Sequence, residues 1–269
     1  MRILYTSDLH GSIRLYKDII EKTRLESIDI VLLGGDLLPR RGQSVESLVM
    51  QKKFIQDTIR PFLKEIKTET KAKVGCILGN NDWAATLPLL NKLEDEKLLF
   101  MLNQKGYMIS KDVHVIGYPY VPPTPFPPKD FEKRDLKSDQ AVQTSNYPAI
   151  SRDGRIESVD DVEYLNKRSS IEEDLQLVSS PDEEKNQIVI YVMHAPPYDT
   201  LLDRLYNSSA KGSKAIKALI QAEQPAVSLH GHIHESVGYR QIGRTLCVNP
   251  GSEYREGILK GFIIKNILL

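Results

Sequence analysis

Residues 2–10 read RILYTSDLH and residues 28–36 read IDIVLLGGD. Each segment begins with an apolar run typical of a buried strand and ends on Asp, His or Gly. The stretch between them, residues 12–26, carries apolar side chains at helical spacing, which predicts an amphipathic helix. A strand, a helix and a second strand in this order form a βαβ unit, so the sequence predicts an α/β fold with a largely parallel sheet.

The same alternation continues along the rest of the chain. Three further apolar runs, residues 73–78, 188–193 and 226–229, each end on a cluster containing Asn, Asp or His. We expect helices over residues 45–67, 84–93 and 211–222, the first with a bend at Pro61. We also expect a hairpin over residues 107–118 and short antiparallel strands over residues 237–242, 245–248 and 258–264.

Residues 119–186 differ in composition from the rest of the chain. This segment opens with six prolines between Pro119 and Pro128 and then becomes highly charged, with a helical stretch at residues 169–178. We interpret residues 1–269 as one domain with an insertion at about 119–186. The insertion is either a solvated linker or a flap over the functional site, and we favour the flap because long inserted loops in compact domains often cover a site.

The 269-residue chain carries 36 basic and 36 acidic residues, so it has no global positive field that would attract nucleic acid or an anionic membrane. No apolar run approaches the roughly 20 residues of a membrane span, and residues 1–5 lead directly into a strand pattern rather than a signal peptide. We expect a cytoplasmic protein without a membrane partner. Cys76 and Cys247 each lie in an apolar run, which predicts buried thiols rather than a disulfide.

Seven side chains that could bind a metal follow predicted strands: Asp8, His10, Asp36, Asn80, His194, His232 and His234. Strand ends of α/β sheets face a common crevice, so we expect these side chains to converge. Asp8 and His10 are two residues apart, as are His232 and His234. This spacing favours convergence, since alternate residues of an extended segment point to the same side. Two carboxylates, one amide and four imidazoles fit two divalent metal ions, with Mn as the first candidate and Fe, Zn, Ni or Co as alternatives.

Five ordered motifs resemble those of the calcineurin-like metallophosphoesterase superfamily: Asp8-Leu9-His10, Gly35-Asp36, Gly79-Asn80, His194 and Gly231-His232-Ile233-His234. The resemblance implies a four-layer αββα β-sandwich flanked by helices. It assigns a first metal to Asp8, His10 and His234. It assigns a second metal to Asn80, His194 and His232, with Asp36 bridging the two.

This resemblance also implies an activity, the hydrolysis of phosphate mono- or diesters. Paired cations bind phosphoryl oxygens and lower the pKa of a bridging water, which yields hydroxide at neutral pH. The hydroxide attacks phosphorus in line with the leaving oxygen, and no covalent intermediate is required.

Asn81 departs from the superfamily pattern, because many members have a histidine directly after the ligand asparagine. An asparagine cannot donate a proton to a leaving alkoxide, although its amide can hydrogen-bond to phosphate. We therefore assign Asn81 a contact with the substrate phosphate and predict slow turnover that favours acidic leaving groups. The following Asp82 is interpreted as a helix cap or as a support for the ligands.

Five other polar residues lie close to the motifs. His230 is interpreted as supporting or structural, because the superfamily pattern does not use it. Arg40 and Arg41 could reach a substrate phosphate, but we favour a solvated loop. Asn249 and Ser252 could hydrogen-bond near the site, and an ordinary turn is the other interpretation.

Two other functions are compatible with the motifs: a protein-binding scaffold that keeps the fold without turnover, and a nuclease of the same superfamily. A degenerate scaffold would have lost ligands, whereas all seven are present. Balanced charge, without an interleaved basic and aromatic patch, argues against a nucleic-acid partner. We therefore favour an enzyme acting on a small phosphoester substrate. The choice between mono- and diester and the oligomeric state stay open.

Overall fold

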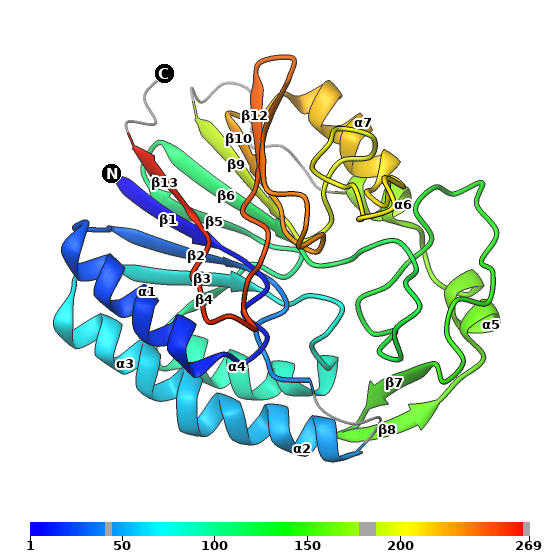
Figure 1. The fold of residues 1–269 in the computed structure, drawn as a ribbon, viewed down its shortest axis with the longest axis horizontal. Helices are drawn as coiled ribbons and strands as arrows, with labels where there is room; N and C mark the ends of the chain where they lie inside the picture. Colours follow the sequence, from blue (N-terminus) through cyan, green and yellow to red (C-terminus); the bar gives the residue numbers. More distant parts are fainter. Residues whose placement is uncertain (41–44, 178–186, 266–269) are drawn as a thin grey trace.

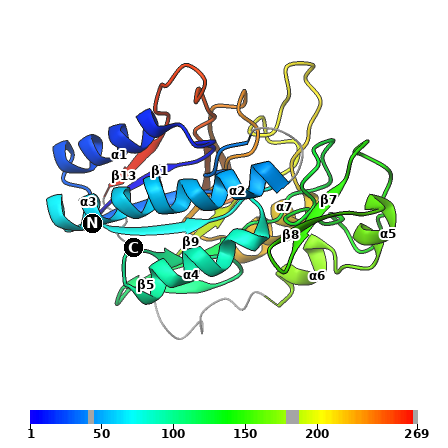
Figure 2. The same cartoon turned by 90° about the horizontal axis from the view of Figure 1, so that it is seen from below.

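The computed structural model describes residues 1–40, 45–177 and 187–265. Two β-sheets pack face to face and helices cover both outer surfaces, which gives four layers in the order α, β, β, α (Figures 1 and 2). This arrangement confirms the predicted sandwich flanked by helices. Within the described residues, we find no helix with both the length and the apolar character needed to span a bilayer.

The first sheet contains the βαβ unit that opens the chain. Its strand order is β13-β1-β2-β3-β4, in which β1 to β4 are parallel and β13 is antiparallel at one edge. The strands span Arg2–Thr6 (β1), Ile30–Gly34 (β2), Lys73–Ile77 (β3), Phe100–Met101 (β4) and Phe262–Lys265 (β13). Because β1, β2 and β3 run in the same direction, the polar residues that follow them emerge at the same edge.

The second sheet has the strand order β11-β12-β10-β9-β6-β5. Its four central strands are parallel, and the two edge strands, β11 and β5, are antiparallel to their neighbours. The strands span Gly106–Ser110 (β5), Val113–Tyr118 (β6), Ile188–Met193 (β9), Val227–Leu229 (β10), Gly238–Ile242 (β11) and Thr245–Asn249 (β12). The predicted hairpin over residues 107–118 is confirmed as the pair β5–β6.

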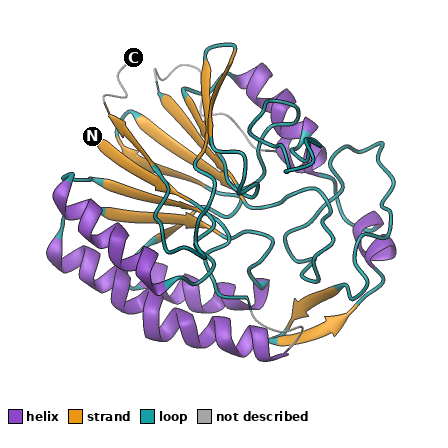
Figure 3. Cartoon of the chain, in the orientation of Figure 1, coloured by secondary structure: helices purple, strands orange, loops and turns teal. Residues whose placement is uncertain are grey.

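Alternate side chains of the central strands fill different layers. In β1, Tyr5 packs between the sheets, whereas Leu4 packs in the outer layer formed with α1 (Ile13–Leu25) and α3 (Arg60–Glu69). In β9, Ile190 packs between the sheets, and the neighbouring side chains pack with α7 (Lys214–Glu223). A strand that is apolar on both faces must be covered on both, so the helices on the outer surfaces follow from the composition of the strands (Figure 3).

The predicted bend at Pro61 is a wider helical turn. Helix α2 (Val45–Phe54) continues through a π-helical segment, Ile55–Ile59, into α3. In a regular α-helix the proline ring would crowd the carbonyl group four residues earlier, and the wider turn relieves this clash. A 3-10 turn (Ala84–Thr86) and α4 (Leu87–Asp95) complete the helical layer on the first sheet.

Residues 119–177 of the insertion form part of the packed body. They contain the hairpin β7 (Ala149–Arg152) and β8 (Arg155–Ser158) and the short helices α5 (Asp161–Asn166) and α6 (Ile171–Leu175). Helix α6 packs its apolar side chains with α7 against the second sheet. The interpretation as a solvated linker is therefore wrong for these residues. Residues 178–186 lie outside the described part of the chain.

Some boundaries differ from the prediction for local reasons. The strand predicted over residues 258–264 begins only at Phe262, and the helix predicted over residues 211–222 begins at Lys214. The start of this helix, α7, is set by Ser213, whose side chain accepts a hydrogen bond from the amide of Ile216. The elements β4, β7, β8 and α5 were not predicted, because they are short or polar and carry no clear hydrophobic period. The two cysteines are free and buried, as predicted.

We expect Ile190→Ala to lower the free energy of unfolding by about 2–5 kcal/mol, because it leaves a cavity between the sheets. Ile190 is fully buried, whereas Leu25 is 72 % exposed, so Leu25→Ala is the matched control. The control should change the free energy of unfolding by less than about 0.5 kcal/mol. Urea unfolding followed by circular dichroism measures both values. Equal losses in the two variants would contradict the packing between the sheets.

Candidate metal centre

Predicted ligands meet at the carboxyl ends of the central strands. The ligand atoms of Asp8, His10 and His234 lie within 4.8 Å of one another. The same is true of the ligand atoms of Asp8, Asp36 and His194. Five of the seven predicted ligands therefore form two groups that share Asp8, and both groups lie where β1, β2, β9 and β10 end.

The first group combines one carboxylate with two imidazoles. The Nε2 atom of His234 lies 3.4 Å from Oδ1 of Asp8, and the Nε2 atoms of His10 and His234 are 3.1 Å apart. Burial lowers the pKa of His10 to about 4, which leaves this ring neutral. Burial also lowers the pKa of His234, but its hydrogen bond to Asp8 raises it above the usual value. A neutral imidazole facing a carboxylate is suited to bind a divalent cation.

Asp36 belongs to the second group and also faces the first. Its Oδ2 atom is 3.7 Å from Nε2 of His10, and its Oδ1 atom is 3.3 Å from Nε2 of His194. Burial raises the pKa of Asp36, but the charge of His194, followed by the charge of His10 and the hydrogen bond from the Asn81 amide, outweighs burial and holds the pKa well below its usual range. Asp36 is therefore ionised, and its two oxygens face imidazoles of different groups.

His194 is oriented by the backbone of the neighbouring sheet. Its Nδ1 atom lies 2.8 Å from the carbonyl oxygen of Gly34, so Nδ1 carries a hydrogen and Nε2 faces the site. Burial lowers the pKa of His194, but the carboxylates of Asp36 and Asp8 raise it to about 9. Metal binding would therefore displace a proton from this ring.

Two buried atoms indicate that this donor set fits metal ions. Among the described residues, Oδ1 of Asn80 has no hydrogen-bond partner, and Nε2 of His194 makes no hydrogen bond, although it faces Asp36 as an ion-pair partner. Buried polar atoms are normally hydrogen-bonded, and metal ligation is one way to satisfy such atoms. Asp8 and Asp36 are 0 % and 4 % exposed, and their ion-pairing partners among the described residues are histidines. Divalent cations would satisfy the orphaned atoms and compensate both carboxylates.

His232 lies beside these groups but belongs to neither of them. The centre of its ring is 5.3 Å from that of His194. Burial lowers the pKa of His232 to about 3, so the ring is neutral. Its backbone amide donates to Asp8, with the nitrogen 3.0 Å from Oδ2. His232 therefore orients one ligand through its backbone while its ring remains close to another.

Four of the predicted ligands have left-handed backbone conformations. The φ angles are 56° at Asp8, 44° at His10, 51° at Asp36 and 66° at His232. Each such residue costs about 1–3 kcal/mol, and such strain clusters at functional sites. Backbone hydrogen bonds hold the loops in place, with the amide of Asp8 donating to Gly35 and that of His10 donating to Asp36.

Glycine permits close approach at two positions in the site. A Cβ atom on Gly79 would lie 2.3 Å from Oδ1 of Asp36 and 2.6 Å from Nε2 of His194. A Cβ atom on Gly231 would lie 2.4 Å from Oδ2 of Asp8. Any side chain at either position would therefore displace a predicted ligand.

Asp82 links two of the ligand loops. Its carboxylate accepts backbone hydrogen bonds from Leu37 and Leu38, which follow Asp36, and from Gly79. Burial and the nearby charge of Asp36 raise the pKa of Asp82 to about 7. This geometry agrees with the interpretation of Asp82 as a support for the ligands.

Three further polar residues make hydrogen bonds to the backbone of loops at or near the site. Asn249 donates its amide hydrogens to backbone carbonyls in the histidine loop, and Ser252 donates its hydroxyl to the carbonyl of Asp8 at 2.7 Å. The Nδ1 atom of His230 lies 2.9 Å from the carbonyl oxygen of Ala195. His230 therefore has a structural position.

The Asn81 side chain is occupied by the protein itself. Its amide nitrogen donates to the carbonyl of Leu38 at 3.0 Å, and the residue is 3 % exposed. Its backbone amide donates to Oδ1 of Asp36 at 2.8 Å. Contact between Asn81 and a substrate phosphate stays a prediction, and these bonds give the residue a second role in holding Asp36.

Arg40 lies in a loop, as predicted, but it is half-buried rather than fully solvated. Its Cζ atom lies 4.6 Å from the ring centre of Phe126 in the insertion. Burial lowers the pKa of Arg40, against opposing effects of Asp36, Tyr254 and Glu132. The guanidinium group makes no hydrogen bond or ion pair with any residue that the structure describes. Arg41 lies outside the described residues.

Tyr254 and Phe126 were not predicted from the sequence to lie near the site. The ring of Tyr254 packs 4.4 Å from that of His10 and 5.8 Å from that of His234, measured between ring centres. Neither aromatic residue belongs to a motif. The clustering of prolines around Phe126, which holds the backbone in a restricted conformation, is the one signal that could have marked it.

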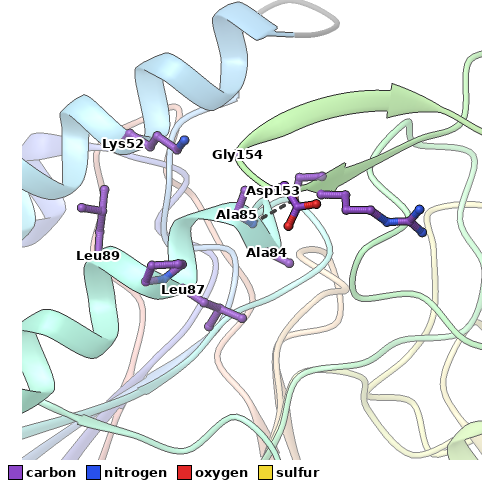
Figure 4. A pocket seen from close by; sticks show the side chains of 10 residues that line it. Lys52, Ala84, Ala85, Leu87, Leu89, Asp153 and Gly154 are labelled. Carbon is purple, nitrogen blue, oxygen red and sulfur yellow. Dashed lines mark hydrogen bonds between the residues drawn. The ribbon is translucent and has the colours of Figure 1, made fainter.

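A separate cavity of about 670 Å³ opens between α2, the start of α4 and the β7–β8 hairpin (Figure 4). Its lining includes Lys52, Ala85 and Asp153 and contains none of the predicted ligands. The hydrogen bond from the amide of Ala85 to the hydroxyl of Ser151 joins the hairpin to the body here. This cavity is therefore a junction between the insertion and the body, distinct from the candidate metal centre.

The sequence model of the family described as calcineurin-like phosphoesterase matches residues 1–236. Over 66 residues the chain is 41 % identical to an uncharacterized protein of Methanocaldococcus jannaschii, and this match spans 23 % of the chain and 30 % of that protein's length. A crystal structure from Thermus thermophilus has a TM-score of 0.56 at 15 % identity, with 97 % of each chain covered. A dimetal phosphatase from Danio rerio has a TM-score of 0.54 at 12 % identity, with 94 % of this chain and 87 % of that chain covered.

These two solved structures share the fold of this chain at low sequence identity. The family match carries more weight, because it covers most of the chain and includes the motifs from Asp8 to His234. The chain therefore belongs to the calcineurin-like phosphoesterase family.

Proposed function

We propose that the protein hydrolyses a phosphoester at a centre of two divalent metal ions. Asp8, His10 and His234 would hold the first ion. The second would be held by Asn80, His194 and His232, with Asp36 shared between the two. The observation that supports this proposal most is the pair of buried ligand atoms, Nε2 of His194 and Oδ1 of Asn80, which make no hydrogen bond among the described residues and lie with two buried carboxylates.

Bound metal ions would supply Lewis acidity and an acidic water at neutral pH. The protein supplies the orientation of the ligands. The carbonyl of Gly34 fixes the ring of His194, and Asp82 holds the loop that follows Asp36 against the loop that carries Asn80. Ligands that are already in place need no reorganisation during the reaction. Such preorganisation is a main source of electrostatic catalysis.

We further propose that Arg40 binds the substrate phosphate. The guanidinium is unpaired among the described residues, half-buried and close enough to Asp36 for its pKa to be affected by that carboxylate. A planar guanidinium donates two parallel hydrogen bonds to phosphoryl oxygens. Arg40 is a better candidate for this contact than Asn81, whose amide is engaged with Leu38.

The physiological substrate in this proposal is a small phosphoester, and Mn is the first candidate metal. A protein-binding scaffold of the same fold would not need ligands with orphaned atoms. A nuclease would need a positive surface that the equal numbers of acidic and basic residues do not favour. The enzyme is therefore preferred over both alternatives.

The metal centre can be tested by metal content. We expect the purified protein, loaded with Mn²⁺ and desalted, to retain two ions per chain by mass spectrometry. Asp36→Ala should retain one or none and lose activity by about 100-fold or more, because the shared ligand is gone. Asp57→Ala removes a carboxylate from an exposed helix and serves as the control. An Asp36→Ala protein that keeps both ions and its activity would refute the shared role of Asp36.

Arg40→Ala should lower kcat/KM by about 10- to 100-fold, because hydrogen bonds to charged groups are strong. Arg40→Lys keeps the charge but loses the paired donors, and should recover only part of the loss. The exposed Arg24 provides the control Arg24→Ala. Steady-state kinetics on the Mn²⁺-loaded enzyme measures the effect, and unchanged kinetics in Arg40→Ala would remove Arg40 from the site.

Asn81 stands where many family members have a histidine, so leaving groups should receive no proton from this position. We expect aryl phosphoesters such as p-nitrophenyl phosphate to be cleaved faster than alkyl phosphoesters. Rates on matched aryl and alkyl substrates, as monoesters and as methyl diesters, test this point. Equal rates on aryl and alkyl compounds would contradict the prediction.

A further inference from the structure

The insertion contacts the segment that follows the predicted ligand Asp36 through Phe126 and Arg40. The Cζ atom of Arg40 lies 4.6 Å from the centre of the Phe126 ring, a distance typical of a cation–π contact. Phe126 is 45 % exposed, so its ring is not part of the apolar core. The contact joins residues 86 positions apart, one directly after the β2 ligand loop and one in the proline-rich segment.

This contact leaves the donors of Arg40 free. A guanidinium stacked on a ring keeps its N–H groups in its own plane, where they can bind phosphate oxygens. Arg40 makes no hydrogen bond or ion pair with the described residues, and the Phe126 ring is a contact that can orient its guanidinium. Without that ring, the long side chain would have to be ordered by the substrate at each binding event.

Phe126 is itself held by a buried polar network. Its backbone amide donates to the hydroxyl of Thr124 at 3.2 Å, and the amide of Thr124 donates to Glu132 at 3.0 Å. Glu132 pairs with Lys129 at 2.8 Å, and both side chains are fully buried. Lys129 also donates to the carbonyl of Thr124 at 2.6 Å. The loop that carries Phe126 is thus fixed by an ion pair that water does not reach.

The network is also anchored to the segment that follows Asn80 along the chain. Asp130, next to Lys129, accepts hydrogen bonds at 2.8 Å from the amides of Ala84 and Ser151. The hydroxyl of Ser151 accepts from the amide of Ala85 at 2.8 Å (Figure 4). Ala84 and Ala85 follow the loop that carries Asn80. The insertion is therefore attached to the body at one of the ligand loops.

We propose that Phe126 is a positioning residue that holds the guanidinium of Arg40 toward the metal centre. The inference rests on the proposed function of Arg40 as a phosphate contact. It assigns the insertion a role in substrate binding: the buried Lys129–Glu132 pair fixes Thr124, Thr124 fixes Phe126, and Phe126 orients Arg40. The insertion then acts as a fixed wall of the site.

A double-mutant cycle tests this coupling. The full chain, loaded with Mn²⁺, is prepared as wild type, Phe126→Ala, Arg40→Ala and the double variant. The affinity for inorganic phosphate is measured by calorimetry, and KM and kcat are measured on p-nitrophenyl phosphate. We expect Phe126→Ala to weaken phosphate binding and raise KM by about threefold to tenfold, in line with the strength of cation–π contacts. In the Arg40→Ala background the same substitution should have no further effect.

Two matched variants separate positioning from stability. Phe126→Tyr keeps an aromatic face and should restore phosphate affinity to within about twofold of wild type. Tyr147→Ala removes another exposed aromatic of the insertion, 66 % exposed, and should leave the affinity unchanged. Thermal unfolding of each variant shows whether the insertion remains folded, and a loss of affinity at unchanged Tm supports positioning.

Other outcomes would overturn the inference. Additive effects of the two substitutions would show that Phe126 acts independently of Arg40. A loss confined to substrates with aromatic leaving groups would show that Phe126 contacts the leaving group instead. If Arg40→Ala left the phosphate affinity unchanged, Arg40 would not contact phosphate, and the inferred role of Phe126 in orienting that contact would be wrong. A wild-type protein that binds phosphate but cleaves no phosphoester would refute the proposed function, while the calorimetric cycle would still decide the role of Phe126.

Discussion

The burial of two carboxylates, Asp8 and Asp36, constrains the rest of the site. A buried charge is costly unless a partner compensates it, and here the ion-pairing partners in the described chain are histidines. Three consequences are visible in the described residues: imidazole rings face the carboxylates, two buried ligand atoms make no hydrogen bond, and backbone amides donate to the carboxylate oxygens. The buried negative charge of the two carboxylates therefore favours a positively charged ligand, and a divalent cation is the simplest ligand of this kind.

Such a site needs a rigid body to hold it. Four predicted ligands have left-handed backbone conformations, and this strain persists because the flanking strands are buried in three apolar layers. The loops connect to each other as well as to the strands. Asp82 ties the loop after β2 to the loop after β3, and Ser252 ties the C-terminal segment to Asp8. Ligands from distant parts of the chain are thus held in one geometry.

The interior of the insertion is more polar than the apolar layers around the two sheets. Polar and charged side chains form much of its buried contacts, including the Lys129–Glu132 pair and the pair between Lys133 and Asp174. A buried ion pair contributes little net stability, but breaking it leaves an uncompensated charge. Such pairs are therefore better at specifying one arrangement of a loop than at stabilising it. A loop of this kind suits a segment that must hold a side chain such as Phe126 at a defined place.

The sequence by itself determined the α/β class and the ligand candidates, and the resemblance of its motifs to the superfamily implied the four layers. Apolar runs of strand length, helical periodicity and polar clusters at strand ends are local signals, and they predicted the central strands and the positions from Asp8 to His234. The tertiary structure decided what local patterns do not encode: that Asn81 bonds to Leu38, that Arg40 is half-buried on Phe126, and that residues 119–177 pack rather than extend as a linker. The physical reason is that these outcomes depend on contacts between residues far apart in the chain, whereas hydrophobic periodicity reports only on neighbours.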